Sequence, residues 1–141
     1  MKIDKGQFNL PDVSRVLDPY RPHMLPKCRS DLIMSGAMGM PCTARVASFL
    51  GMKCDGRDTG IGAHLTRQGK GMSTKVTDLG VAYTCFTCHM IIDGVDPQWR
   101  DGIVKLYPVA YYQRLLEAVV ETHTLQAAQG ILIVPDAEWV G

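Results

Sequence analysis

The residues with the clearest chemistry in this sequence are four cysteines. Two of them stand in Cys85-Phe86-Thr87-Cys88, where two intervening residues let a tight turn present both sulfurs to one ion. A second pair, Cys42 and Cys54, lies upstream with eleven residues between its members. Zinc accepts four thiolates in a tetrahedron, and all-cysteine sites of this kind are closed and structural. We therefore expect a structural Zn²⁺ on Cys42, Cys54, Cys85 and Cys88.

Two other interpretations of these cysteines stay open. They could be ordinary buried thiols, which pack as small apolar side chains. They could also include a redox pair, but a thioredoxin-like CxxC follows a strand and opens a long helix in a βαβ unit, and the surrounding sequence offers none. The chain has five cysteines, so they cannot all pair within it. Cys28 is the cysteine with no assigned role.

A histidine and a carboxylate follow the CxxC directly. His89 comes after Cys88, and Asp93 lies four residues further on. On a helix these two side chains share a face, so both can reach one cation. An imidazole and a carboxylate with open positions suit a catalytic Mg²⁺ or Mn²⁺. With His64 of GAHLT as a base that activates water, the set suits phosphodiester hydrolysis. Taken singly, His64 and Asp93 are better explained as structural residues, whereas together with the CxxC they form a more specific pattern.

The elements that must position these residues are short, and they predict a small α+β domain. Strands are expected at 61–65 and 81–83, and a helix at 86–93 that ends at Gly94. A long helix is expected over 108–128, with Gly130 after it. Its apolar stripe is expected to pack in the core, and it consists of Tyr112, Leu115, Leu116, Val119 and Val120.

Further elements are less regular. A short helix is expected within 31–40, a strand or turn within 44–50, a helix start at Asp96-Pro97 and a terminal strand at 131–134. Residues 1–30 hold four prolines and little periodicity, which indicates an irregular segment. The expected organisation is an irregular N-terminal arm over 1–34, a zinc-stabilised core over 35–94 and a C-terminal helical segment over 95–141 that packs on the core.

The stretches GMPCTARV, Cys54, GAHL and CFTCHMIID together resemble a known family. They are similar to the HNH, or ββα-metal, nucleases, and more narrowly to the small phage and prophage proteins of the YbcO type. The resemblance covers roughly residues 35–94. It implies a treble-clef-like ββα-metal core and a metal-dependent DNA endonuclease.

The resemblance also implies roles for individual residues. His64 matches the general base, His89 and Asp93 match the ligands of the catalytic divalent ion, and the four cysteines match the zinc ligands. Asp78 stands where the pattern has its central Asn, so it is expected to orient His64. The sequence departs from the pattern at Ala63, where many such enzymes have a further metal ligand, and in the wide Cys42–Cys54 spacing.

Charge and composition set the partners that we expect. Residues 1–92 hold 12 basic and 7 acidic residues, whereas residues 93–141 hold 3 and 7. This asymmetry is compatible with a polyanion on one face. The expected DNA contacts lie in or beside a glycine-rich stretch, and they are Arg57, Arg67, Lys70 and Lys75.

The remaining expectations concern substrate and place. No base-reading motif is present, so the expected substrate is DNA recognised by shape, such as branched DNA or a single-strand/duplex junction. The sequence lacks a membrane span and a secretory signal, so a cytoplasmic location is expected, the host's if the chain is phage-encoded. The alternatives are a non-catalytic zinc-finger module that binds nucleic acid, and an assembly factor that forms a homodimer.

Overall fold

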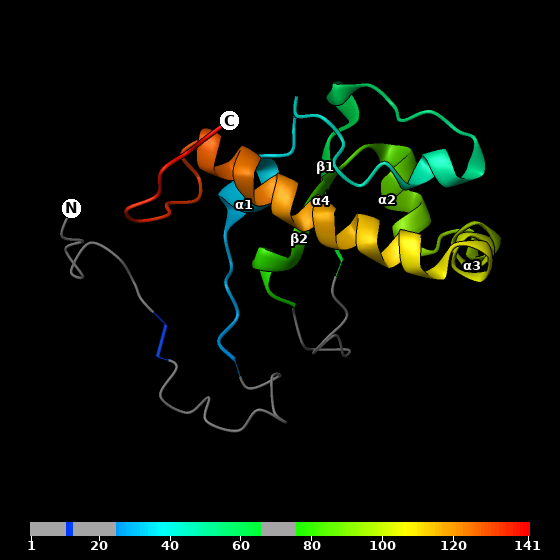
Figure 1. Ribbon diagram of the computed structural model, residues 1–141, viewed down its shortest axis with the longest axis horizontal. Coiled ribbons are helices and arrows are strands. Elements are labelled where there is room, and N and C mark those ends of the chain that lie inside the picture. Colours follow the sequence, from blue (N-terminus) through cyan, green and yellow to red (C-terminus); the bar gives the residue numbers. More distant parts are fainter. Residues whose placement is uncertain (1–10, 13–24, 66–75) are drawn as a thin grey trace.

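The protein is a mixed α+β chain with a two-stranded sheet and four α-helices in the described part. The computed structural model describes residues 11–12, 25–65 and 76–141 (Figure 1). The helices and strands in chain order are α1 (Asp31–Ser35), β1 (Ile61–His64), β2 (Val81–Thr84), α2 (Phe86–Asp93), α3 (Pro97–Leu106) and α4 (Pro108–Ala128). The α+β class and the strand–strand–helix order expected for the core are both present.

The hairpin places His64 at the end of its first strand. β1 and β2 are antiparallel, with Ile61 opposite Thr84 and His64 opposite Val81. β2 is buried along its whole length, so it is the central element of the domain. Because a two-stranded hairpin is marginal alone, it needs cover from other elements.

Helix α2 follows β2 after a single residue, and local signals define both of its ends. Cys85 is the N-cap, and its sulfur accepts a hydrogen bond from the Cys88 N–H. Gly94 ends the helix with a φ of 68°, a left-handed conformation that glycine adopts without strain. The helix predicted over 86–93 is confirmed with these bounds.

The C-terminal helices pack on this core. Asp96 caps α3 by accepting a hydrogen bond from the Gln98 N–H, as its place before Pro97 predicted. Helix α4 has the predicted bounds and lies against β2, crossing the hairpin in Figure 1. Its buried residues are Tyr111, Ala118, Thr122 and Gln126. The main core cluster joins the hairpin to α2, α3 and α4, and it comprises Ala44, Val46, Ala47, Ala82, Cys85, Cys88, Ile91, Ile92, Ile103, Tyr111 and Ala118.

Two expectations about local structure are wrong. Most of the stripe on α4 lies outside the core, because Tyr112, Leu116 and Val120 are each at least 60% exposed, although Leu115 of the stripe packs against the core cluster. The helix instead buries the neighbouring face, half of which is polar. Residues 131–134 contain no strand, only a bend at 131–132. Of the strand or turn expected within 44–50, the structure has the turn, a 3₁₀ helix at Val46–Leu50.

The short helix expected within 31–40 is present. Residues 25–30 have no helix or strand, as expected for the arm. Asp31–Ser35 form α1, with Ser30 as its N-cap, and this helix packs beside β1. A side chain at Gly62 of β1 would meet the Met34 carbonyl oxygen at 3.3 Å, which shows how closely the two elements approach. The rest of the expected arm, apart from residues 11–12, lies outside the described residues.

Candidate functional site

The four predicted cysteines converge on one point. Their sulfur atoms all lie within 4.8 Å of one another, with Cys85 and Cys88 buried and Cys54 exposed. The Cys54 and Cys88 sulfurs are 3.8 Å apart. In a tetrahedral site with Zn–S bonds of about 2.3 Å, neighbouring sulfurs are about 3.8 Å apart. The cluster can therefore hold a structural metal ion such as zinc, and Cys28 is not part of it.

Backbone N–H groups point at three of these sulfurs. The Cys42 sulfur accepts from the Arg45 N–H at 3.4 Å, the Cys85 sulfur from the Cys88 N–H at 3.5 Å, and the Cys88 sulfur from the Ala47 N–H at 3.5 Å. Hydrogen bonds to the charged form of a group favour that form. The backbone thus stabilises thiolates, which are the form that binds a metal.

The protonation of the cluster also suits a cation. The pKa of Cys42 is lowered to about 5, chiefly because Cys88 donates a hydrogen bond to it. The same hydrogen bond, and then burial, raises the pKa of Cys88. Burial, followed by the charges of Cys42 and Cys85, raises the pKa of Cys54 to about 12. Without a cation the four thiols cannot all ionise, whereas a bound metal replaces their protons.

Asp55 connects the two cysteine pairs. It follows Cys54, and its carboxylate accepts a hydrogen bond from the Thr87 N–H at 2.7 Å, between Cys85 and Cys88. Hydrogen bonds from the Thr87 hydroxyl and then the Thr87 N–H hold the pKa of Asp55 below its ordinary value. The carboxylate also lies at the N-terminus of α2, where a negative charge is favourable.

His64 and Asp78 are in direct contact. The His64 Nε2 atom lies 2.9 Å from an Asp78 carboxylate oxygen, and the Asp78 side chain is only 2% exposed. The other oxygen accepts a hydrogen bond from the Ser30 N–H at 2.6 Å, and Arg29 approaches the first oxygen at 3.2 Å. Burial alone would raise the pKa of Asp78, but the Ser30 and His64 hydrogen bonds and the Arg29 charge hold it below its ordinary value.

His89 and Asp93 face each other on one side of α2. The His89 Nε2 atom is 3.0 Å from an Asp93 carboxylate oxygen. Two adjacent ligands of an octahedral ion with bonds of about 2.0–2.1 Å are about 3 Å apart, so this spacing fits Mg²⁺. Among the described residues, the cysteine cluster is the one group of three or more metal-binding side chains. An ion on His89 and Asp93 would therefore take its other ligands from water or substrate.

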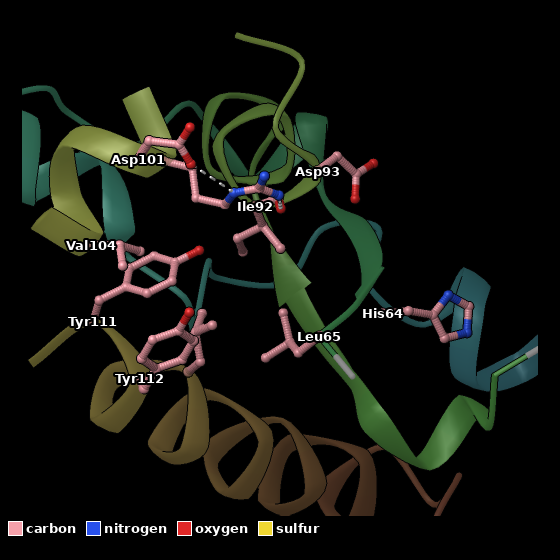
Figure 2. Close-up of a pocket in the computed structure, with 10 residues that line it drawn as sticks. His64, Leu65, Ile92, Asp93, Asp101, Val104, Tyr111 and Tyr112 are labelled. Carbon is pink, nitrogen blue, oxygen red and sulfur yellow. Dashed lines mark hydrogen bonds and ion pairs between the residues drawn. The ribbon is translucent and has the colours of Figure 1, made fainter. Parts of the chain in front are cut away.

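A cleft of about 390 Å³ connects His64 with Asp93. Apolar side chains of α2, α3 and α4 line it, together with Leu65 just after β1. The lining also includes four titratable groups beside the tyrosines, namely His64, Asp93, Arg100 and Asp101. Figure 2 shows Tyr111 and Tyr112 on one side of the cleft and Asp93 and His64 on the other. The His64 ring is turned away from the tyrosines, so its polar atoms lie at the edge of the cleft.

The predicted DNA contacts are only partly described. Arg57 is exposed in a 3₁₀ turn, Arg57–Thr59, just before β1. Arg67, Lys70 and Lys75 lie outside the described residues.

The sequence did not point to several residues of the site. Arg29 and Ser30 lie almost fifty residues from Asp78 along the chain, and no motif links them. Arg100 and Tyr112 belong to helices that looked like plain packing elements. A Cβ at Gly94 would lie 2.8 Å from the Arg100 guanidinium, but the positive φ of Gly94 alone accounts for a glycine at this position, so the sequence carried no signal for Arg100.

Comparison with known proteins found no match. No protein-family model, curated protein or solved structure matches the chain. Within the described ranges, no helix combines the length and the apolar character needed to cross a membrane.

Proposed function

We propose that the protein is a metal-dependent DNA endonuclease of the HNH, or ββα-metal, type with a structural zinc. The observation that supports this proposal most is the arrangement of two histidine–carboxylate pairs around one cleft. A hairpin followed directly by a helix puts His64, held by Asp78, and Asp93, paired with His89, at the edge of one cleft.

Asp78 determines which nitrogen of His64 acts as the base. An ionised carboxylate is an acceptor only, so the ring nitrogen that faces it, Nε2, is the one that donates. The lone pair is then on Nδ1, which takes a proton from the attacking water. As the water oxygen bonds to phosphorus, the bond to the leaving 3′ oxygen breaks. A divalent ion held by His89 and Asp93 would neutralise the charge that develops on the phosphate.

The test is a cleavage assay on supercoiled plasmid, single-stranded and branched DNA with Mg²⁺ or Mn²⁺. His64→Ala should lower the rate by about 10²–10⁴-fold, the usual contribution of a general base. His123→Ala is the matched control, because His123 lies on α4, bonds the Leu79 carbonyl oxygen and is not among the residues lining the cleft. Equal rates for wild type and His64→Ala would refute the assignment of the base.

One observation favours a second candidate, a non-catalytic zinc module that binds nucleic acid. His89 and Asp93 already contact each other directly at 3.0 Å, and the four cysteines alone account for a metal site. This candidate predicts DNA binding without cleavage by any of the metals tested.

A further inference from the structure

We infer that the cleft beside His64 and Asp93 binds an unpaired nucleobase, which Tyr112 stacks against, so that the protein selects single-stranded or locally unpaired DNA. The inference deepens the proposed function and rests on it for the position of the scissile phosphate. The nucleobase site itself is inferred from the residues that line the cleft.

The shape and lining of the cleft suit a flat, partly apolar group. Its volume of about 390 Å³ falls within the range of small-molecule sites, roughly 300–1,000 Å³. Leu65, Ile92, Val104 and Leu115 give it apolar walls, which a phosphate backbone alone would not need. The charged groups stand with these walls in the same cleft, so a nucleotide can place its phosphate and its base on different parts of one site.

Tyr112 has the properties of a stacking platform. It is 60% exposed, although it lines the cleft. An edge-on contact with Tyr111 holds it, with ring centroids 5.2 Å apart and an interplanar angle of 75°. Tyr111 is itself buried, and its ring packs edge-on against Phe49, with ring centroids 6.4 Å apart. Because the buried ring restrains the exposed one, little conformational freedom is lost when a base stacks on Tyr112.

Arg100 is placed to bind the phosphate next to such a base. Its guanidinium lies over the end of α2, 3.4 Å from the Ile92 carbonyl oxygen, and its Nε is 3.8 Å from an Asp101 carboxylate oxygen. Both contacts are longer than ordinary charged hydrogen bonds, so the donors can turn to a phosphate with little loss. The negative charges of Asp93 and Asp101 repel a phosphate, and a cation on Asp93 would offset this repulsion.

Unpaired DNA is favoured over paired DNA for a physical reason. In a duplex each base is already stacked and paired, so entering the cleft costs a few kcal/mol of unstacking, whereas a single strand offers its bases freely. The cleft therefore discriminates without reading sequence, since every base has a face that stacks on an aromatic ring.

The experiment measures binding rather than cleavage. Fluorescence anisotropy gives the affinity of the full chain, with Ca²⁺ present, for an oligothymidine of about 12 nucleotides and for the duplex that it forms with oligoadenosine. A gel run afterwards checks that the strands are intact. Tyr112→Ala should weaken binding of the single strand by about 5- to 150-fold, the range for loss of one stacked base. Binding of the duplex should not change.

Two further variants keep the test specific. Tyr112→Phe retains the ring and should retain the affinity. Trp139→Ala removes another exposed aromatic side chain, outside the cleft, and should have no effect. The inference is overturned if Tyr112→Ala binds the single strand as wild type does, or if it weakens single strand and duplex by the same factor.

The outcomes separate this inference from the proposed function. Tyr112-dependent binding of single strands without cleavage by Mg²⁺ or Mn²⁺ would overturn the nuclease proposal and support the base site. Cleavage of duplex DNA that is indifferent to Tyr112 would overturn the base site and support the nuclease proposal.

Discussion

Replacing Asp78 with asparagine tests the centre of the candidate site, because it keeps the shape of the side chain and changes only its hydrogen bonding. The carboxylate accepts from three donors, which are the Ser30 N–H at 2.6 Å, His64 Nε2 at 2.9 Å and Arg29 at 3.2 Å. An amide has one acceptor oxygen, and its nitrogen donates. If the amide oxygen stays with Ser30, the amide nitrogen of the variant side chain must face His64 and Arg29.

The expected loss of stability follows from these contacts. Hydrogen bonds to charged groups contribute about 1.5–3 kcal/mol each, and Asp78→Asn loses the charge in a side chain that is 2% exposed. The Arg29 pair adds little, because the Arg29 side chain is 47% exposed. We expect the free energy of unfolding to fall by about 1.5–3 kcal/mol, measured by urea denaturation.

The expected loss of activity has a different origin. An amide nitrogen facing His64 makes Nε2 the acceptor, so the ring proton moves to Nδ1 and the base loses its lone pair on that side. Cleavage should then slow by about 10²–10⁴-fold. In a His64→Ala background, Asp78→Asn should have no further effect on the rate. Nitrogen NMR of the histidine rings distinguishes the two tautomers directly.

The pH dependence of stability gives an independent check. The pKa of Asp78 is below its ordinary value in the folded protein. Its contribution to stability is therefore complete above about pH 4 and is lost as the pH falls through the lower, folded pKa. Asp78→Asn should be less sensitive to acid than wild type. The reasoning is refuted if the variant cleaves DNA at the wild-type rate with an unchanged His64 tautomer.

Two further predictions concern the scaffold. Elemental analysis should find one zinc per chain, and a zinc-free wild-type protein would contradict this. Cys54→Ser should lower the zinc content and the melting temperature, whereas Cys28→Ser, outside the cluster, should change neither. Thr122→Val should lower the free energy of unfolding by about 1–3 kcal/mol, because the buried Tyr83 N–H loses its acceptor. Thr122→Ser keeps the hydroxyl and should lose less stability. Equal losses for the two variants in calorimetry would show that the hydroxyl is unimportant.

The sequence predicted the parts of this fold that depend on local signals. Cys85 and Gly94 mark the ends of α2, and Asp96 marks the start of α3, because caps act within a few residues. The cysteine cluster was also predictable, since few other arrangements satisfy four thiols that include a CxxC.

Prediction failed where distant contacts decide. Apolar residues on α4 fall on two neighbouring faces, and the buried face is the one with Thr122 and Gln126, which bond or contact the hairpin. Hydrophobicity alone therefore selected a face that is mostly exposed, although its Leu115 packs against the core. Residues 131–134 have the composition of a strand. A strand also needs a sheet edge to pair with, and the local sequence does not show whether such an edge is available. The same limit hid the approach of Arg29 and Ser30 to Asp78.

The hydrogen bonds around Tyr83 have a consequence for how the protein can associate. The Tyr83 carbonyl oxygen accepts from the Thr43 N–H at 2.8 Å and from the Thr43 hydroxyl at 3.0 Å, and the Tyr83 N–H donates to Thr122. These bonds occupy the backbone on the edge of β2 that faces away from β1. An extended peptide or the sheet of a second copy finds no template for strand addition there. The β2 edge of the hairpin is thus protected against edge-to-edge aggregation by a loop and a helix side chain, and because the side chains of β2 are buried as well, a partner must bind elsewhere on the surface.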